Sequence, residues 1–136
     1  MTPTQNERPI DAPRRTRTAI VLAVGIGVLV GLLMHANVAF QLAPVLLAQI
    51  ACFAAAIVVP AGLCMLATNR YPLIALGFAA GVALAIVAVH VATRGIGNLW
   101  TEPLAQCALI FVIVSCPALL STGICAVWKR EKKSTP

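Results

Sequence analysis

Residues 18–69 read TAIVLAVGIGVLVGLLMHANVAFQLAPVLLAQIACFAAAIVVPAGLCMLATN, a run of 52 residues without Asp, Glu, Lys or Arg. A single helix of that length would measure about 78 Å, whereas the hydrocarbon core of a bilayer is about 30 Å thick. The run must therefore fold back on itself. We place the turn at His35 to Gln41, where polar side chains gather, because Pro44 follows close to the start of the next helix, where proline is tolerated.

Two further apolar runs complete the chain, and polar, Gly and Pro residues separate them. Thr68 to Pro72 forms one break, and Thr93 to Glu102 forms a loop that contains Gly95. The sequence thus predicts an all-α polytopic membrane protein, with four transmembrane helices in an antiparallel bundle. The predicted spans are residues 18–36, 41–67, 72–92 and 103–128, with a disordered basic tail at 1–17 and a second basic tail at 129–136.

The composition excludes most classes of soluble protein and enzyme. Of the 136 residues, 60% are hydrophobic and only 10% are charged, whereas soluble domains average about 25% charged residues. Four spans use most of the length and leave no room for a separate catalytic domain. Nucleophile–base pairs, phosphate loops and paired carboxylates are missing from the sequence. We therefore expect no enzymatic activity.

The basic residues set the orientation. In the four-span arrangement, nine of the ten Lys and Arg fall on one side of the membrane and only Arg94 falls on the other. This positive-inside bias places both ends of the chain in the cytoplasm, with the protein in the cell inner (plasma) membrane. Tyr71 and Trp128 would lie at the cytoplasmic border, and Phe40 and Trp100 at the outer one. The formal net charge of +6 reflects this placement, and we expect no nucleic-acid partner.

A cleaved signal peptide is the rival interpretation of the first span. The apolar stretch there exceeds the usual length of about 7 to 15 residues, and no small-residue cleavage site follows it.

Small residues recur at four-residue spacing in the first and third spans. Such grooves let two helix backbones approach closely in lipid, where hydrophobicity gives no drive for association. They predict either packing of the two spans within one chain, which we favour, or contact with a second copy or a partner subunit. The residues are Ala23, Gly27 and Gly31 in the first span and Gly77, Gly81 and Ala85 in the third.

Potential metal ligands fall near the expected outer surface. His35, His90 and Cys107 suggest a transition-metal ion held by two imidazoles and a thiolate, or a haem between the two histidines. The alternative is that interfacial histidines bond to water, lipid headgroups or loop carbonyls. We favour this alternative and assign no cofactor. The five cysteines show no C-x-x-C spacing and are interpreted as apolar packing residues.

Three functions fit this pattern. The first is a non-enzymatic accessory or assembly subunit of a larger membrane complex, or of a homo-oligomer. The second is an oligomeric channel or carrier for a small solute, lined by polar side chains of the second and fourth spans: Gln49, Ser115, Ser121 or Thr122. The third is a metal- or haem-binding membrane protein that uses the outer histidines. The spans contain no Asp, Glu, Lys or Arg, the residues on which proton-coupled pumps usually depend.

Overall fold

The described part of the chain folds into four helices. The computed structural model describes residues 11–67, 70–95 and 102–134, which form α1 (Asp11–Phe40), α2 (Val45–Leu66), α3 (Tyr71–Arg94) and α4 (Glu102–Ser134). All four are long and apolar enough to cross a membrane, as a multi-pass membrane protein requires. Residues 1–10 of the expected tail and Trp100 lie outside the described residues, so the expectations placed on them stay predictions.

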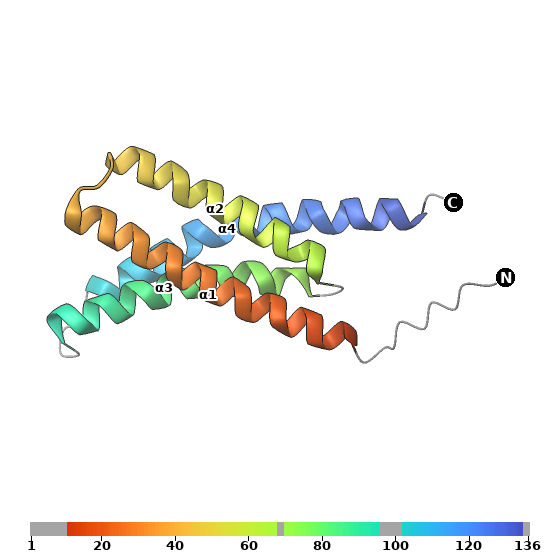
Figure 1. The fold of residues 1–136 in the computed structure, drawn as a ribbon, viewed down its shortest axis with the longest axis horizontal. Helices are drawn as coiled ribbons and strands as arrows, with labels where there is room; N and C mark the ends of the chain where they lie inside the picture. The colour runs from red at the N-terminus through yellow and green to blue at the C-terminus, as the bar shows by residue number, and fades with distance from the viewer. Residues whose placement is uncertain (1–10, 68–69, 96–101, 135–136) are drawn as a thin grey trace.

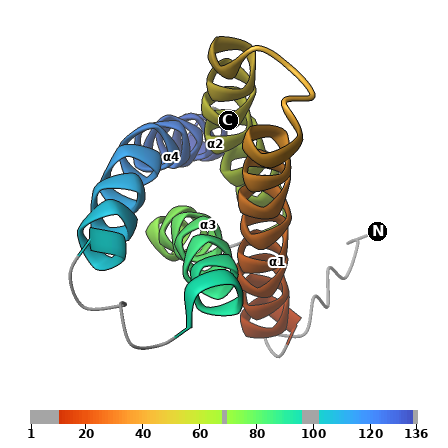
Figure 2. The same ribbon diagram turned by 90° about the vertical axis from the view of Figure 1, so that its left-hand side faces the viewer.

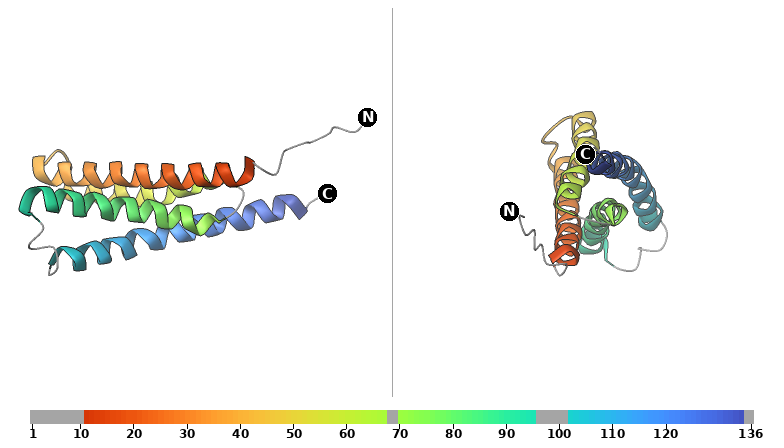
Figure 3. Two further views of the ribbon diagram at one scale, coloured as in Figure 1. Left: turned by 90° about the horizontal axis from the view of Figure 1, so that it is seen from below. Right: turned by 90° about the vertical axis from the view of Figure 1, so that its right-hand side faces the viewer.

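The helices lie lengthwise beside one another (Figures 1 and 3). At one end of the molecule, here called the distal end, α1 and α3 end while α2 and α4 begin; α1 begins and α4 ends at the opposite, terminal end (Figure 1). The main contacts run around the bundle from α1 to α3, α4 and α2, and back to α1. Seen from the distal end, α2 and α4 stand well apart (Figure 2).

The first turn lies later in the chain than the sequence predicts. Helix α1 continues through His35 to Phe40, and the connection starts at Gln41, whose φ is 50°. Asn37 accounts for the difference. Its Oδ1 accepts a hydrogen bond from the Ala43 N–H (2.8 Å), and its Nδ2 donates to the Ala43 carbonyl (3.4 Å). Asn37 is still part of α1, and its side chain stabilises the connection to α2 through these two hydrogen bonds. The polar residue therefore stabilises the turn but does not form it.

Helices α1 and α4 extend into the regions predicted as tails. Residues 11–17 belong to α1, and residues 129–134 belong to α4. The two helices therefore continue beyond the predicted spans, and the bounds of the spans themselves stay predictions. Arg, Lys and Glu are good helix formers, and a helix already nucleated inside a membrane adds residues at little cost.

Lys129 closes the terminal end of the bundle. Its Nζ donates to the carbonyls of Cys64 (2.5 Å), Met65 (3.3 Å) and Ala67 (3.0 Å) at the end of α2. These carbonyls have no partner within their own helix, and the ammonium also complements the negative end of the helix dipole. The same Nζ lies 5.3 Å from the centroid of the Tyr71 ring at the start of α3. One side chain of α4 thus ties together the end of α2 and the beginning of α3.

The closest helix contact is between α1 and α3, at the small residues. A β-carbon placed on Gly27 would collide with the carbonyl of Phe78, and one placed on Gly81 would lie 2.9 Å from the Val28 nitrogen. Both contacts are with backbone, which cannot move aside. Any larger residue at either position would push the two helices apart.

The same interface continues toward both ends of the two helices. A β-carbon on Gly31 would lie 2.7 Å from the Ala85 Cβ, while Gly77 is looser, with 3.4 Å to a Val24 methyl group. Ala23 and Ala85 are buried as well. The structure therefore brings five of the six small residues into one interface within the chain, and the sixth, Ala23, is buried.

Candidate functional site

A cavity of about 650 Å³ opens between the distal halves of the four helices. Its volume lies within the range of about 300 to 1,000 Å³ that is usual for small-molecule sites. Every helix contributes to the wall: Gly31, Met34, His35 and Val38 from α1; Gln49, Cys52, Phe53 and Ala56 from α2; Val82 and Ile86 from α3; and Gln106, Ile110, Ile113 and Val114 from α4.

The cavity exists because α2 and α4 diverge toward the distal end (Figure 2). Toward the terminal end, buried side chains fill the centre of the bundle. Pro60, Cys64, Ile74, Phe78 and Thr122 are the largest fully buried side chains there. The cavity therefore lies in the distal half of the bundle, within a single chain.

Three polar side chains line this otherwise apolar pocket. His35 lies near the end of α1, and Gln49 and Gln106 lie in the first turns of α2 and α4. None of the three has a hydrogen-bond partner elsewhere in the described part of the chain, and all three are exposed to the pocket. Together they present two amides and one imidazole, which can both donate and accept hydrogen bonds.

No Asp, Glu, Lys or Arg is found among the residues that line the pocket. A bound molecule would consequently meet hydrogen-bonding groups but no fixed charge. Because a charged group in this apolar setting would lack a counter-ion, the pocket fits an uncharged molecule with an apolar body and one or two polar atoms.

The metal ligands expected from the sequence are not gathered into one site. His35 lines the pocket, but Cys107 is buried outside its wall, and the Nε2 of His90 is buried without a hydrogen-bond partner among the described residues. Over residues 11–67, 70–95 and 102–134, no three His, Cys, Asp or Glu side chains lie close enough to hold a metal ion. The three side chains therefore do not form the proposed metal centre.

The polar residues expected to line a solute path divide into two groups. Gln49 faces the pocket, whereas the hydroxyls of Ser115, Ser121 and Thr122 donate to carbonyls of their own helix α4, at Phe111, Ala118 and Leu119. Those hydroxyls are already satisfied, so only Gln49 keeps the role expected of it. Sequence reasoning did not group it with Gln106. The sequence did contain a signal for this grouping. Both glutamines lie near the starts of spans that begin at the same side of the membrane, and His35 lies near the end of the first span at that side.

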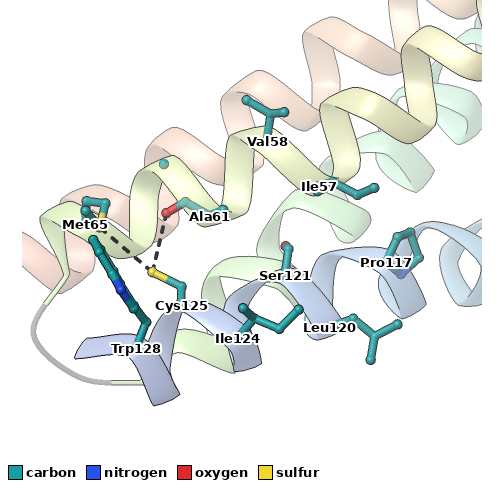
Figure 4. Close-up of a pocket in the computed structure, with 11 residues that line it drawn as sticks. Ile57, Val58, Ala61, Met65, Pro117, Leu120, Ser121, Ile124, Cys125 and Trp128 are labelled. Atoms are coloured by element: carbon teal, nitrogen blue, oxygen red, sulfur yellow. Dashed lines mark hydrogen bonds between the residues drawn. The ribbon is translucent and has the colours of Figure 1, made fainter. Parts of the chain in front are cut away.

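A second, largely apolar groove of about 730 Å³ lies between the terminal halves of α2 and α4 (Figure 4). It is lined mainly by aliphatic side chains such as Ile57, Val58, Leu120 and Ile124, with Trp128 at its rim. Large apolar side chains of this kind face outward all along α2 and α4. In a bilayer they would contact lipid, so the distal pocket is the better candidate for a specific ligand.

Comparison with protein-family models, with curated proteins and with solved structures finds no match to this chain.

Proposed function

We propose that this protein is a non-enzymatic, multi-pass protein of the cell inner membrane that binds, and carries, a small uncharged amphipathic molecule in the pocket between its four helices. The single observation that carries the proposal is the pocket itself, an apolar chamber with His35, Gln49 and Gln106 on its wall. We infer that a lipid-dissolved molecule enters between the distal halves of α2 and α4, where the two helices diverge (Figure 2).

The orientation belongs to the same proposal. The bundle is antiparallel, with the terminal end in the cytoplasm and the pocket on the outer side. Arg14 and Arg15 near the start of α1 and Lys129, Arg130 and Lys132 near the end of α4 support this orientation, since positive charge favours the cytoplasmic face.

Photolabelling in reconstituted membranes tests the pocket. The probe is 1-azidoanthracene, an uncharged molecule with a large apolar body. The expected result is labelling concentrated on the pocket-lining parts of α1, α2 and α4, with a several-fold loss in Ile113→Trp, which fills the pocket. Val112→Trp is the matched control, because Val112 is adjacent in sequence but points away from the pocket wall. Equal labelling of the two variants would contradict the proposal.

Solute flux tests the carrier step separately. Proteoliposomes that contain the chain should take up an uncharged solute faster than empty vesicles, and Gln49→Leu should reduce this rate. Ser121→Ala is the control, because its hydroxyl bonds to its own helix and does not face the pocket. Site-selective labelling without flux would leave a binding protein that is not a carrier.

An accessory subunit remains the second proposal, for a specific reason. Gly62 of α2 and Gly123 of α4 face open space, with no atom within 4 Å of an added β-carbon. Exposed glycines let another helix approach closely. In-membrane crosslinking from these two positions tests this function. If it returned only monomer, the accessory-subunit proposal would be contradicted.

A further inference from the structure

Three sulfur atoms converge between the terminal halves of α2 and α4. The Cys125 Sγ of α4 lies 3.9 Å from the Sδ of Met65 and 3.9 Å from the carbonyl oxygen of Ala61, both on α2 (Figure 4). Cys64 directly precedes Met65 in sequence, and it is fully buried in the core cluster against which Cys125 packs. Two thiols and one thioether therefore gather from positions about sixty residues apart in the chain.

The separation of the Met65 and Cys125 sulfur atoms suits a metal ion. A metal–thiolate bond is about 2.3 Å long, so three sulfurs arranged in a trigonal plane around one ion stand about 4.0 Å apart. The observed separation of Met65 Sδ and Cys125 Sγ is 3.9 Å. Thiolate and thioether ligands are soft donors that select Cu(I) among the biological metals. We propose that Cys64, Met65 and Cys125 form a binding site for Cu(I).

The ligand set also discriminates against zinc. Structural zinc takes four ligands in a tetrahedron, and within the described residues no group of three or more His, Cys, Asp or Glu is available to supply them. Two thiolates and a thioether satisfy Cu(I), which accepts two or three ligands, but they leave Zn²⁺ short of donors.

Lys129 balances the charge of the occupied site. When Cu(I) binds, the S–H bonds of Cys64 and Cys125 break, two copper–sulfur bonds form, and Met65 adds a lone pair from its thioether. Two protons leave to water, and copper enters and remains as Cu(I), so no electron is transferred. The resulting bis-thiolate complex carries one negative charge. The Lys129 ammonium, which donates to the Cys64 carbonyl, supplies the matching positive charge.

The ion has a route to this site. Met65 is 55% exposed, and Cys125 is half-buried on the wall of the apolar groove, whereas Cys64 is fully buried. An ion arriving from the terminal end would meet Met65 and Cys125 first and then reach Cys64. The exposed thioether acts as the entry ligand, and the buried thiol is the most shielded of the three.

Anaerobic titration of the full chain in lipid nanodiscs tests the proposal, with Cu(I) as the probe and bicinchoninate as the competing chelator. Wild type should bind one Cu(I) per chain. Cys125→Ser should lower the affinity by more than tenfold, because even outer-shell changes at metal sites cost roughly 10- to 100-fold. Met65→Leu keeps the packing volume and should lower the affinity by less. Cys116→Ser is the matched control, since Cys116 lies on the same helix α4, exposed to the bilayer, and it should bind as wild type does.

X-ray absorption at the copper edge gives the second readout. The expected spectrum shows only sulfur neighbours, at about 2.3 Å. Nitrogen or oxygen neighbours in this spectrum would overturn the site. So would a wild-type affinity for Cu(I) no higher than that of Cys125→Ser and Met65→Leu. An equal loss of affinity in Cys116→Ser would overturn it as well. The photolabelling of the distal pocket is independent of all these outcomes.

Discussion

The α1–α3 pair and the α2–α4 pair use opposite means of holding two helices together. In the first pair, glycines bring the two backbones into direct contact over the length of the interface. In the second, the two helices diverge toward the distal end (Figure 2). The pair is tied at the terminal end by Lys129 and is open at the distal end around the pocket. Close backbone contact fixes one side of the bundle and leaves the other side free to hold a ligand.

The largest effect is expected where the α1–α3 contact is tightest. Gly81→Leu forces a side chain against the backbone of Val24 and Val28, and should lower the free energy of unfolding by about 3 kcal/mol. The measurement is reversible unfolding in bicelles, followed by circular dichroism. Gly62→Leu on α2 is the control and should change stability little, because its position faces open space. Equal losses in the two variants would mean that the interface is not as close as described.

The next effect concerns the charged tie that Lys129 makes between α4 and the end of α2. Lys129→Met removes the donor to three carbonyls at the end of α2 and should cost about 2 kcal/mol, as for hydrogen bonds that involve a charged group. Lys132→Met serves as the control. That ammonium lies over the exposed Trp128 ring, 4.4 Å from its centroid, so we expect a loss of about 0.5 kcal/mol or less. A larger loss of stability in Lys132→Met than in Lys129→Met would contradict the role given to Lys129.

A smaller effect is expected at the distal connection. Asn37→Leu removes both bonds to Ala43 and should cost about 1 kcal/mol, while Asn37→Asp keeps an acceptor for the Ala43 N–H and should cost less. Unfolding in the same bicelles measures both variants. If the leucine variant were as stable as wild type, the turn between α1 and α2 would not depend on this clamp.

The sequence predicted the number of helices because the cost of burying charge in lipid leaves long runs without Asp, Glu, Lys or Arg. Small residues at four-residue spacing also pointed to Gly27 and Gly81, since that spacing places them on one helix face. Both signals are local in the chain and follow from the periodicity of a helix.

The helix ends and the site could not be predicted in the same way. Asn37 was interpreted as part of a turn, and Lys129 as part of a tail, because each acts through a backbone group whose position only the fold defines. The pocket depends on how far α2 and α4 diverge, which no residue pattern specifies. The meeting of Cys125 with Met65 likewise depends on the register of two helices about sixty residues apart.

Amide hydrogen exchange in lipid nanodiscs compares the two pairs of helices directly, at equal depth in the membrane. Residues 28–36 of α1 and 82–90 of α3 should exchange much more slowly than residues 46–53 of α2 and 105–113 of α4, since the first two segments pack against each other and the last two border the open pocket. Equal protection of all four segments, or faster exchange in α1 and α3, would contradict a bundle in which α1 and α3 are in close contact while α2 and α4 diverge around the pocket.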